Sequence, residues 1–110
     1  MMDARIPVLA QQLLLIEREL RVQGWWQIEP PSEQALASQE PFCVDSMAFD
    51  QWLQWIFLPR MKHMLENGAA LPSVSGIQPM AEQVYGSRNE QAEVLMRLLG
   101  EFDRLIGGVR

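Results

Sequence analysis

Apolar residues near the start of the chain recur at intervals of three and four, the spacing of one face of an amphipathic α-helix. This face consists of Ile6, Leu9, Leu13, Ile16 and Leu20. Pro7 fits the first turn of such a helix, where its missing N–H costs little, and Gly24 suits the positive φ at which a helix stops. The pattern predicts a helix over about residues 4–23.

A second apolar set on the same segment widens this face. It consists of Val8, Leu14, Leu15 and Val22. Apolar residues over so wide an arc are typical of a helix that packs against several neighbours. We therefore expect the first helix to be buried on more than one side.

Residues 24–45 have the features of a connector. Pro30-Pro31 favours extended backbone, because a proline restricts both itself and the residue before it. Ser32 can cap one short helical turn that reaches Ala37.

A broad apolar stripe predicts a second long helix, from near Ser46 to Asn67-Gly68. Pro59 falls in its middle, where a proline removes one hydrogen bond and costs about 3 kcal/mol in an isolated helix. The stripe continues in phase across the proline, so we expect one helix kinked at Pro59 and not two helices. Asp45 or Ser46 is expected to cap its first turn.

Pro79 and Gly86 bracket a short helix of two turns, and a last helix follows it. Ser87 and Glu90 have the spacing of a capping box at the start of that last helix. Its core stripe comprises Leu95, Leu98, Leu99, Phe102, Leu105 and Ile106. The chain has no alternating strand pattern of useful length. We therefore expect an all-α, four-helix bundle-like fold in a single domain over residues 1–110.

The composition is that of an ordinary globular domain and limits the possible chemistry. Of the 110 residues, 48% are hydrophobic and 21% are charged. A single Cys rules out a disulfide framework, and one Cys with one His argues against a structural zinc site. The formal net charge of -5 lacks the basic footprint of a nucleic-acid-binding protein. We expect no metal, no cofactor and no direct nucleic-acid partner.

The apolar start of the chain fits neither a signal peptide nor a membrane span. Glu17, Arg18 and Glu19 interrupt it, and no small-residue cleavage site follows. An unpaired thiol without an export signal is typical of the cytoplasm. We expect a cytoplasmic protein without a membrane partner.

The reactive side chains do not form a catalytic pattern. His63 would need a nearby carboxylate and a nucleophile, and Cys43 is the only thiol. We interpret them as a partly exposed helical histidine and a small buried thiol, and we assign no catalytic residue.

The tryptophans are the most informative side chains. Four tryptophans are many for so small a domain, and a residue of this size is seldom fully hidden. Trp and Arg are also the residues that dominate binding energy at protein interfaces. Our candidate binding residues are therefore Trp26, Trp52, Trp55 and Arg60, although core filling by the tryptophans and a solvated surface role for the arginine stay open.

One segment resembles a known family signature. Residues 41–61, PFCVDSMAFDQWLQWIFLPRM, resemble the signature of the YqcC-like family of small bacterial proteins. The matching positions are Pro41, Phe42, Asp45, Ser46, Met47, Trp52, Leu53, Gln54, Trp55, Pro59, Arg60 and Met61. Glu29-Pro30 and Leu71-Pro72 also stand at the family's spacing, whereas the C-terminal helix is similar only in pattern.

The resemblance implies a compact helical bundle and points to a neighbouring enzyme. Members of this family are commonly encoded beside a C-type tRNA pseudouridine synthase, and some carry that enzyme's name. The enzyme itself needs a large mixed α/β domain with a catalytic Asp in an Arg-Leu-Asp context. This sequence has only Phe102-Asp103-Arg104-Leu105, within an expected helix. We do not expect it to have the synthase activity.

Two functions remain open at this point. We favour a non-enzymatic accessory or adaptor protein with a protein partner, for which that tRNA-modifying enzyme is a candidate. The alternative is a small-molecule-binding protein or minimal enzyme with a pocket lined by Trp52, Trp55 and Met61. A flat aromatic patch would favour the first, and an enclosed pocket of at least about 300 Å³ with converging polar groups the second. The sequence leaves homo-oligomerisation open.

Overall fold

The computed structural model describes residues 3–86 and 89–107, and within these ranges every regular element is helical, as predicted. In chain order the elements are α1 (Ile6–Val22), α2 (Glu33–Leu36), the 3₁₀ turn η1 (Pro41–Cys43), α3 (Phe49–Trp52), the π-helical stretch η2 (Leu53–Phe57), α4 (Leu58–Glu66), α5 (Ile77–Tyr85), the 3₁₀ turn η3 (Glu90–Ala92) and α6 (Glu93–Ile106).

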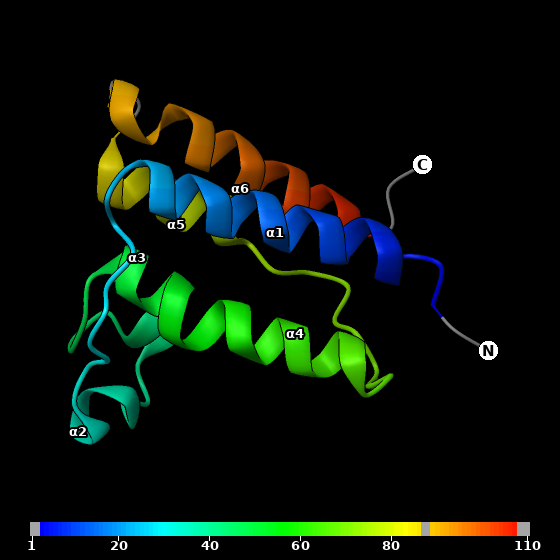
Figure 1. Ribbon diagram of the computed structural model, residues 1–110, viewed down its shortest axis with the longest axis horizontal. Helices are drawn as coiled ribbons and strands as arrows, with labels where there is room; N and C mark the ends of the chain where they lie inside the picture. Colours follow the sequence, from blue (N-terminus) through cyan, green and yellow to red (C-terminus); the bar gives the residue numbers. More distant parts are fainter. Residues whose placement is uncertain (1–2, 87–88, 108–110) are drawn as a thin grey trace.

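Helices α1 and α6 lie side by side and run in opposite directions (Figure 1). The predicted stripes of both helices meet in the core, which confirms their periodicity. Their fully buried members are Leu9, Leu13, Ile16, Leu20, Leu95, Leu99, Phe102 and Ile106. One buried polar group joins the pair, because the side-chain amide of Gln12 donates to the carbonyl oxygen of Leu98 at 2.8 Å.

Elements α3, η2 and α4 follow one another without a break and form the central helix of the molecule (Figure 1). Leu53, Phe57, Leu58 and Met61 bring it into the common core. The ring of Phe57 meets that of Phe102 edge to face, with centroids 5.0 Å apart. The prediction of one helix across Pro59 is confirmed.

The irregularity of the central helix lies one turn before Pro59. The N–H of Leu58 donates to the carbonyl oxygen of Leu53, an i→i−5 bond in place of the α-helical i→i−4 bond. Pro59 has no N–H with which to continue the ladder, and its ring would press on the preceding turn of a regular α-helix. The wider π-helical turn removes that pressure, so the chain accommodates the proline through a change of register.

The prediction that α1 is buried on more than one side was wrong for three of the four residues of its second apolar set, of which only Leu15 is half-buried. Val8, Leu14 and Val22 are exposed, Leu14 to 62%. Helix α1 packs against α6 and α4, and its fully buried apolar residues all belong to the stripe that begins at Ile6. Among the described residues, no further helix covers the exposed members of the second apolar set.

The predicted cap of the central helix was also wrong. The helix begins at Phe49, and its N-cap is Ala48, whose N–H donates to the side-chain oxygen of Gln51 at 2.8 Å. Asp45 and Ser46 lie before this point in the chain. Asp45 instead accepts a hydrogen bond from the hydroxyl of Ser38, and the Ser46 hydroxyl donates to the carbonyl oxygen of Ala35 at 2.9 Å. They hold α2 against the turn that follows it.

The sequence also predicted caps at Ser32 and Ser87, and only the first lies within the described residues. The side chain of Ser32 accepts from the N–H of Ala35 at 3.1 Å, which confirms the predicted cap of α2. Ser87, the first member of the expected capping box with Glu90, lies outside the described residues. Asn89 caps η3, since its side-chain oxygen accepts from the N–H of Ala92 at 3.2 Å.

A carboxylate from α6 caps the start of α5. The two oxygens of Asp103 accept from the backbone N–H groups of Ile77 at 3.0 Å and Gln78 at 2.8 Å, and from the hydroxyl of Ser75. A helix N-terminus presents unpaired N–H groups and a partial positive charge, so a carboxylate is well suited to it. This carboxylate fixes α5 to α6.

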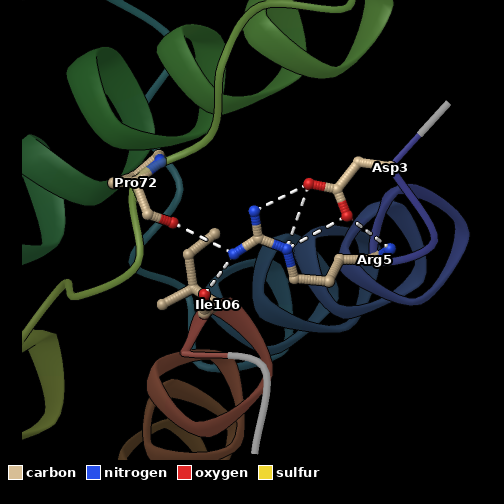
Figure 2. A network of polar contacts seen from close by, with 4 residues as sticks. All are labelled: Asp3, Arg5, Pro72 and Ile106. Atoms are coloured by element: carbon tan, nitrogen blue, oxygen red, sulfur yellow. Dashed lines mark hydrogen bonds and ion pairs between the residues drawn. The ribbon is translucent and has the colours of Figure 1, made fainter. Parts of the chain in front are cut away.

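Arg5 closes the α1–α6 pair at the end where α1 begins and α6 ends (Figure 2). Its guanidinium lies 2.7 Å from the carboxylate of Asp3 and donates to the carbonyl oxygens of Pro72, at 3.2 Å, and Ile106. The hydrogen bonds from Arg5 lower the pKa of Asp3 to about 2. One side chain thus joins the start of α1, the end of α6 and the loop that precedes α5.

Candidate functional site

The connector leaves α1 through a sharp turn at Gly24. This residue has a φ of 76°, and the N–H of Trp25 returns to the carbonyl oxygen of Leu20 at 2.9 Å. This closure is the one expected of a helix that stops at a glycine. The ring of Trp25 then stacks on Tyr85 at 5.3 Å between centroids, which fixes the connector against α5.

Gln54 holds the next part of the connector by its backbone. Its side-chain oxygen accepts from the N–H of Gln27 at 2.8 Å, and its side-chain nitrogen donates to the carbonyl oxygen of Gln27 at 2.7 Å. A buried amide that satisfies both backbone groups of one residue replaces the ladder partner that an extended segment otherwise lacks. The central helix thereby determines where residues 26–28 lie.

Between this clamped segment, α1 and the central helix lies an open groove of about 650 Å³. The central helix contributes Gln54, Trp55, Leu58, Pro59 and Lys62, α1 contributes Glu17 and Arg21, and the connector contributes Trp26, Gln27 and Ile28. The groove therefore has an apolar and aromatic character on two sides and a charged edge on α1.

The charged groups of the groove are paired with one another. The carboxylate of Glu17 forms ion pairs with the ammonium group of Lys62 at 2.8 Å and the guanidinium of Arg21 at 3.2 Å. The hydrogen bond from Lys62 is the main reason that the pKa of Glu17 is lowered. The guanidinium carbon of Arg21 also lies 4.2 Å from the ring centroid of Trp26. The charged side chains along this edge are therefore paired within the protein itself.

The structure brings together two of the four candidate binding residues. Trp26 and Trp55 both line the groove. The indole Nε1 of Trp55 is covered by protein atoms and has no hydrogen-bond partner among the described residues, so it does not present a donor to the groove. The contribution of Trp55 to the groove is therefore apolar surface.

The other two candidates lie elsewhere. Trp52 belongs to an aromatic cluster in which Phe42 lies at 4.8 Å and Phe57 at 5.6 Å between ring centroids. Arg60 is exposed and is not among the residues that line the groove. Met61 is buried in the core. The pocket expected from Trp52, Trp55 and Met61 is therefore not formed.

The turn η1 has unusual backbone geometry. Phe42 has a φ of 57° and Cys43 a φ of 51°, both in the left-handed region that costs a residue with a side chain about 1–3 kcal/mol. Packing offsets that cost, since Phe42 contacts the aromatic cluster and Cys43 is buried. The thiol of Cys43 is thus a core group, as the sequence suggested.

The remaining reactive groups have structural contacts. His63 is exposed on α4, where the side chain of Asn67 contacts its ring and its carbonyl group. Over residues 3–86 and 89–107, no group of three or more His, Cys, Asp or Glu side chains is placed to hold a metal ion.

The sequence contains two further features that point to the groove and the connector and that the predictions above did not use. Gln54 is a polar residue within an apolar helical stripe, which is typical of a side chain with a specific partner. The second signal is charge: residues 22–59 contain Glu29, Glu33, Glu40, Asp45 and Asp50 and no Lys or Arg. The other nine acidic residues balance the nine Lys and Arg residues of the chain, so the net charge of -5 originates in this segment.

Comparison with known proteins gives the family. The model of the family DUF446, described as tRNA pseudouridine synthase C, matches residues 8–105. The chain belongs to this family. The resemblance found in residues 41–61 is thereby confirmed for nearly the whole chain.

Three relatives show how the family is distributed. An uncharacterized protein of Haemophilus influenzae is 39% identical over 89 residues, which cover 81% of each chain. The uncharacterized protein YqcC of Escherichia coli is 31% identical over 94 residues, 86% of each chain. A protein of Pectobacterium carotovorum named tRNA pseudouridine synthase C is 52% identical over 62 residues, which cover 56% of this chain and 16% of that protein.

A solved structure agrees with the fold. The solution NMR structure of Escherichia coli YqcC superposes with a TM-score of 0.85 at 27% identity and covers 98% of this chain and 92% of that chain. In the part of the chain that the structure describes, no helix is long and apolar enough to span a membrane.

Proposed function

We propose that this protein is a non-enzymatic accessory protein that binds a tRNA pseudouridine synthase of the C type. The Pectobacterium relative supports this proposal most directly. A protein that carries the name of the synthase contains a segment 52% identical to this chain, and that segment is 16% of its length. In that relative, a segment similar to 56% of this chain and a much longer sequence belong to one polypeptide.

Covalent linkage gives a physical reason to expect binding between separate chains. Two modules in one polypeptide meet at a high effective concentration, so even a weak contact between them is occupied. When the same modules are separate, the contact surface has to supply the affinity itself.

The interior of the molecule supports an accessory role over an enzymatic one. Asp103, the residue nearest to a synthase-like context in the sequence, has both oxygens engaged by the start of α5. A catalytic carboxylate needs access to a substrate in a cleft. The carboxylate of Asp103 instead acts as a helix cap.

The groove supports a second candidate, the binding of a small molecule. Its volume of about 650 Å³ is large enough for a ligand. The groove is open, however, and its polar groups are engaged with each other at Glu17, Gln27 and Gln54. We therefore rank small-molecule binding below protein binding.

Isothermal titration calorimetry with size-exclusion chromatography tests the proposal. We expect the purified chain to bind the C-type synthase of the same bacterium and to co-elute with it when RNA is absent. A tRNA pseudouridine synthase of another type, from the same bacterium, is the control and should give no binding heat. Absence of both heat and co-elution with the C-type enzyme would refute the proposal.

A further inference from the structure

Ile28 is the most exposed large apolar residue among the described residues, at 95%. It forms part of the connector wall of the groove, beside Trp26. Because Gln54 holds both backbone groups of Gln27, the chain on either side of this contact is fixed in place. Ile28 is thus held outward on a supported segment, where it has no apolar neighbour to cover it.

The same part of the chain is strongly acidic. Glu29 follows Ile28 directly, and Glu33, Glu40 and Asp45 are also exposed. They lie in or close to α2 and η1, and we call this part of the chain the acidic lobe. Figure 1 shows it around the label α2. Val44, 59% exposed, adds a second apolar residue to this lobe. An apolar contact surrounded by charge of one sign has the composition of an interface with a polar rim.

We infer that Ile28, the connector wall of the groove and the acidic lobe form the docking surface for the synthase, and that this surface receives a basic region of that enzyme. The inference rests on the proposed function and adds which face is used and the chemistry of the partner's surface. The partner would offer Lys and Arg side chains around an apolar socket that takes Ile28.

Charge decides between this occupant and the others. A symmetric dimer of this chain through the same surface would place the acidic lobes of both copies together, and like charges across an interface oppose association. An RNA backbone would meet the same repulsion, because its phosphates are also negative. A basic protein surface is the occupant whose charge complements residues 22–59.

The charged residues of the groove itself change the negative charge of this surface little. Arg21 of α1 and Lys62 of α4 share the carboxylate of Glu17, so these three groups together have one net positive charge where α1 meets the central helix. On the connector side, every charged residue between positions 22 and 59 is acidic. The partner's basic residues are therefore expected opposite the connector and α2, with its apolar residue toward the groove.

Binding kinetics on an immobilised, RNA-free synthase test the inference. The double variant Glu29→Lys with Glu40→Lys should slow association about tenfold or more at low salt and weaken its dependence on ionic strength, because rim charges act mainly on the association rate. The matched control is Glu66→Lys with Glu82→Lys, which makes the same change of charge at exposed positions outside the acidic segment. It should change the rate about twofold or less.

A second pair of variants tests the apolar contact. Ile28→Ala should raise the dissociation rate about tenfold, as expected for an anchor residue near the centre of an interface. Val74→Ala, at a position that is 80% exposed in the loop before α5, should leave it unchanged. Thermal melts of all four variants should match that of the wild-type chain, since every substituted side chain is exposed.

The outcomes separate the inference from the proposed function. If the wild-type chain binds and the two charge variants behave alike, the docking surface is refuted and the accessory role stands. The same holds if Ile28→Ala dissociates at the wild-type rate. If the wild-type chain does not bind the synthase, both are refuted.

Discussion

The α1, α5 and α6 region and the connector between α1 and α3 are stabilised in different ways. In the first, helices satisfy their own backbone, and large side chains such as Phe102 and Leu99 are fully buried. In the second, α2 and η1 are short, and side chains hold the backbone, chiefly Gln54, Ser32 and Ser46. The first region supplies most of the apolar burial, and the second displays a charged surface in a fixed position.

Under the proposed function, this difference separates stability from recognition. Buried apolar area is the main favourable term in folding, and it is concentrated in the helices. The connector has little such area, yet it carries the exposed Ile28 and four of the five acidic residues from which the net charge originates. Substitutions in the two regions should therefore have different consequences, and the predictions below are ordered by the size of the expected effect.

The largest effect is expected from Phe102→Ala. This ring is 1% exposed and packs against Phe57, so its removal leaves a cavity between α6 and the central helix. We expect a loss of about 3–5 kcal/mol in the free energy of unfolding, measured by urea denaturation. Ile28→Ala is the control in the other region and should stay within about 0.5 kcal/mol. Equal losses would contradict the division between the regions.

A smaller loss is expected from Asp103→Ala. The substitution leaves the N–H groups of Ile77 and Gln78 without their acceptor, and we expect it to cost about 1–3 kcal/mol. Asp103→Asn keeps one acceptor oxygen and should lose less. Hydrogen exchange should become faster at the start of α5 in the alanine variant. Unchanged stability would show that this carboxylate has a role other than capping.

The contrast between these helices and the connector also explains what the sequence could predict. Helical spacing indicated α1 and α6 to within a few residues, because a single periodic stripe determines each of them. The cap of α5 could not be found in this way, since Asp103 reaches it from 25 residues along the chain. Contacts between distant residues leave no local pattern.

The candidate site also depends on contacts between distant residues, which the sequence could not predict. Trp26 and Trp55 were proposed because of their residue type, but the groove that joins them depends on Gln54 and Gln27, which are 27 residues apart. The cap at Ala48 was missed because alanine has no capping side chain and the neighbouring Gln51 supplies the hydrogen bond instead. Residue type suggested members of the site, and only the fold could assemble them.

Gln54→Ala tests the support of the connector. It removes both hydrogen bonds to Gln27 and should cost about 1–2 kcal/mol. Gln51→Ala is the matched control on the same helix, because Gln51 contacts the N–H of Ala48 and the side chain of Gln27 at a more exposed position. It should cost less than Gln54→Ala. Chemical shifts of residues 25–29 should change with Gln54→Ala and show whether the groove wall has moved.

The smallest effect is the pH dependence of Glu17. The pKa of its carboxyl is lowered from that of an unperturbed glutamate, chiefly because of the hydrogen bond from Lys62. Its contribution to stability is therefore present above about pH 4.5 and is lost as the pH falls through the lowered pKa. The difference in unfolding free energy between the wild type and Glu17→Gln should be constant near neutral pH and should shrink in acid. A difference that grows as the pH falls would contradict this pairing.

Hydrogen–deuterium exchange of the chain, alone and with the C-type synthase, tests the central claim most directly. The claim is that one region supplies stability and the other recognises a protein partner. We expect the synthase to slow exchange across residues 25–45 and to leave the core amides of α6 and those of α5 unchanged. New protection confined to the α5–α6 face, or no new protection anywhere at a synthase concentration that saturates binding, would contradict the account.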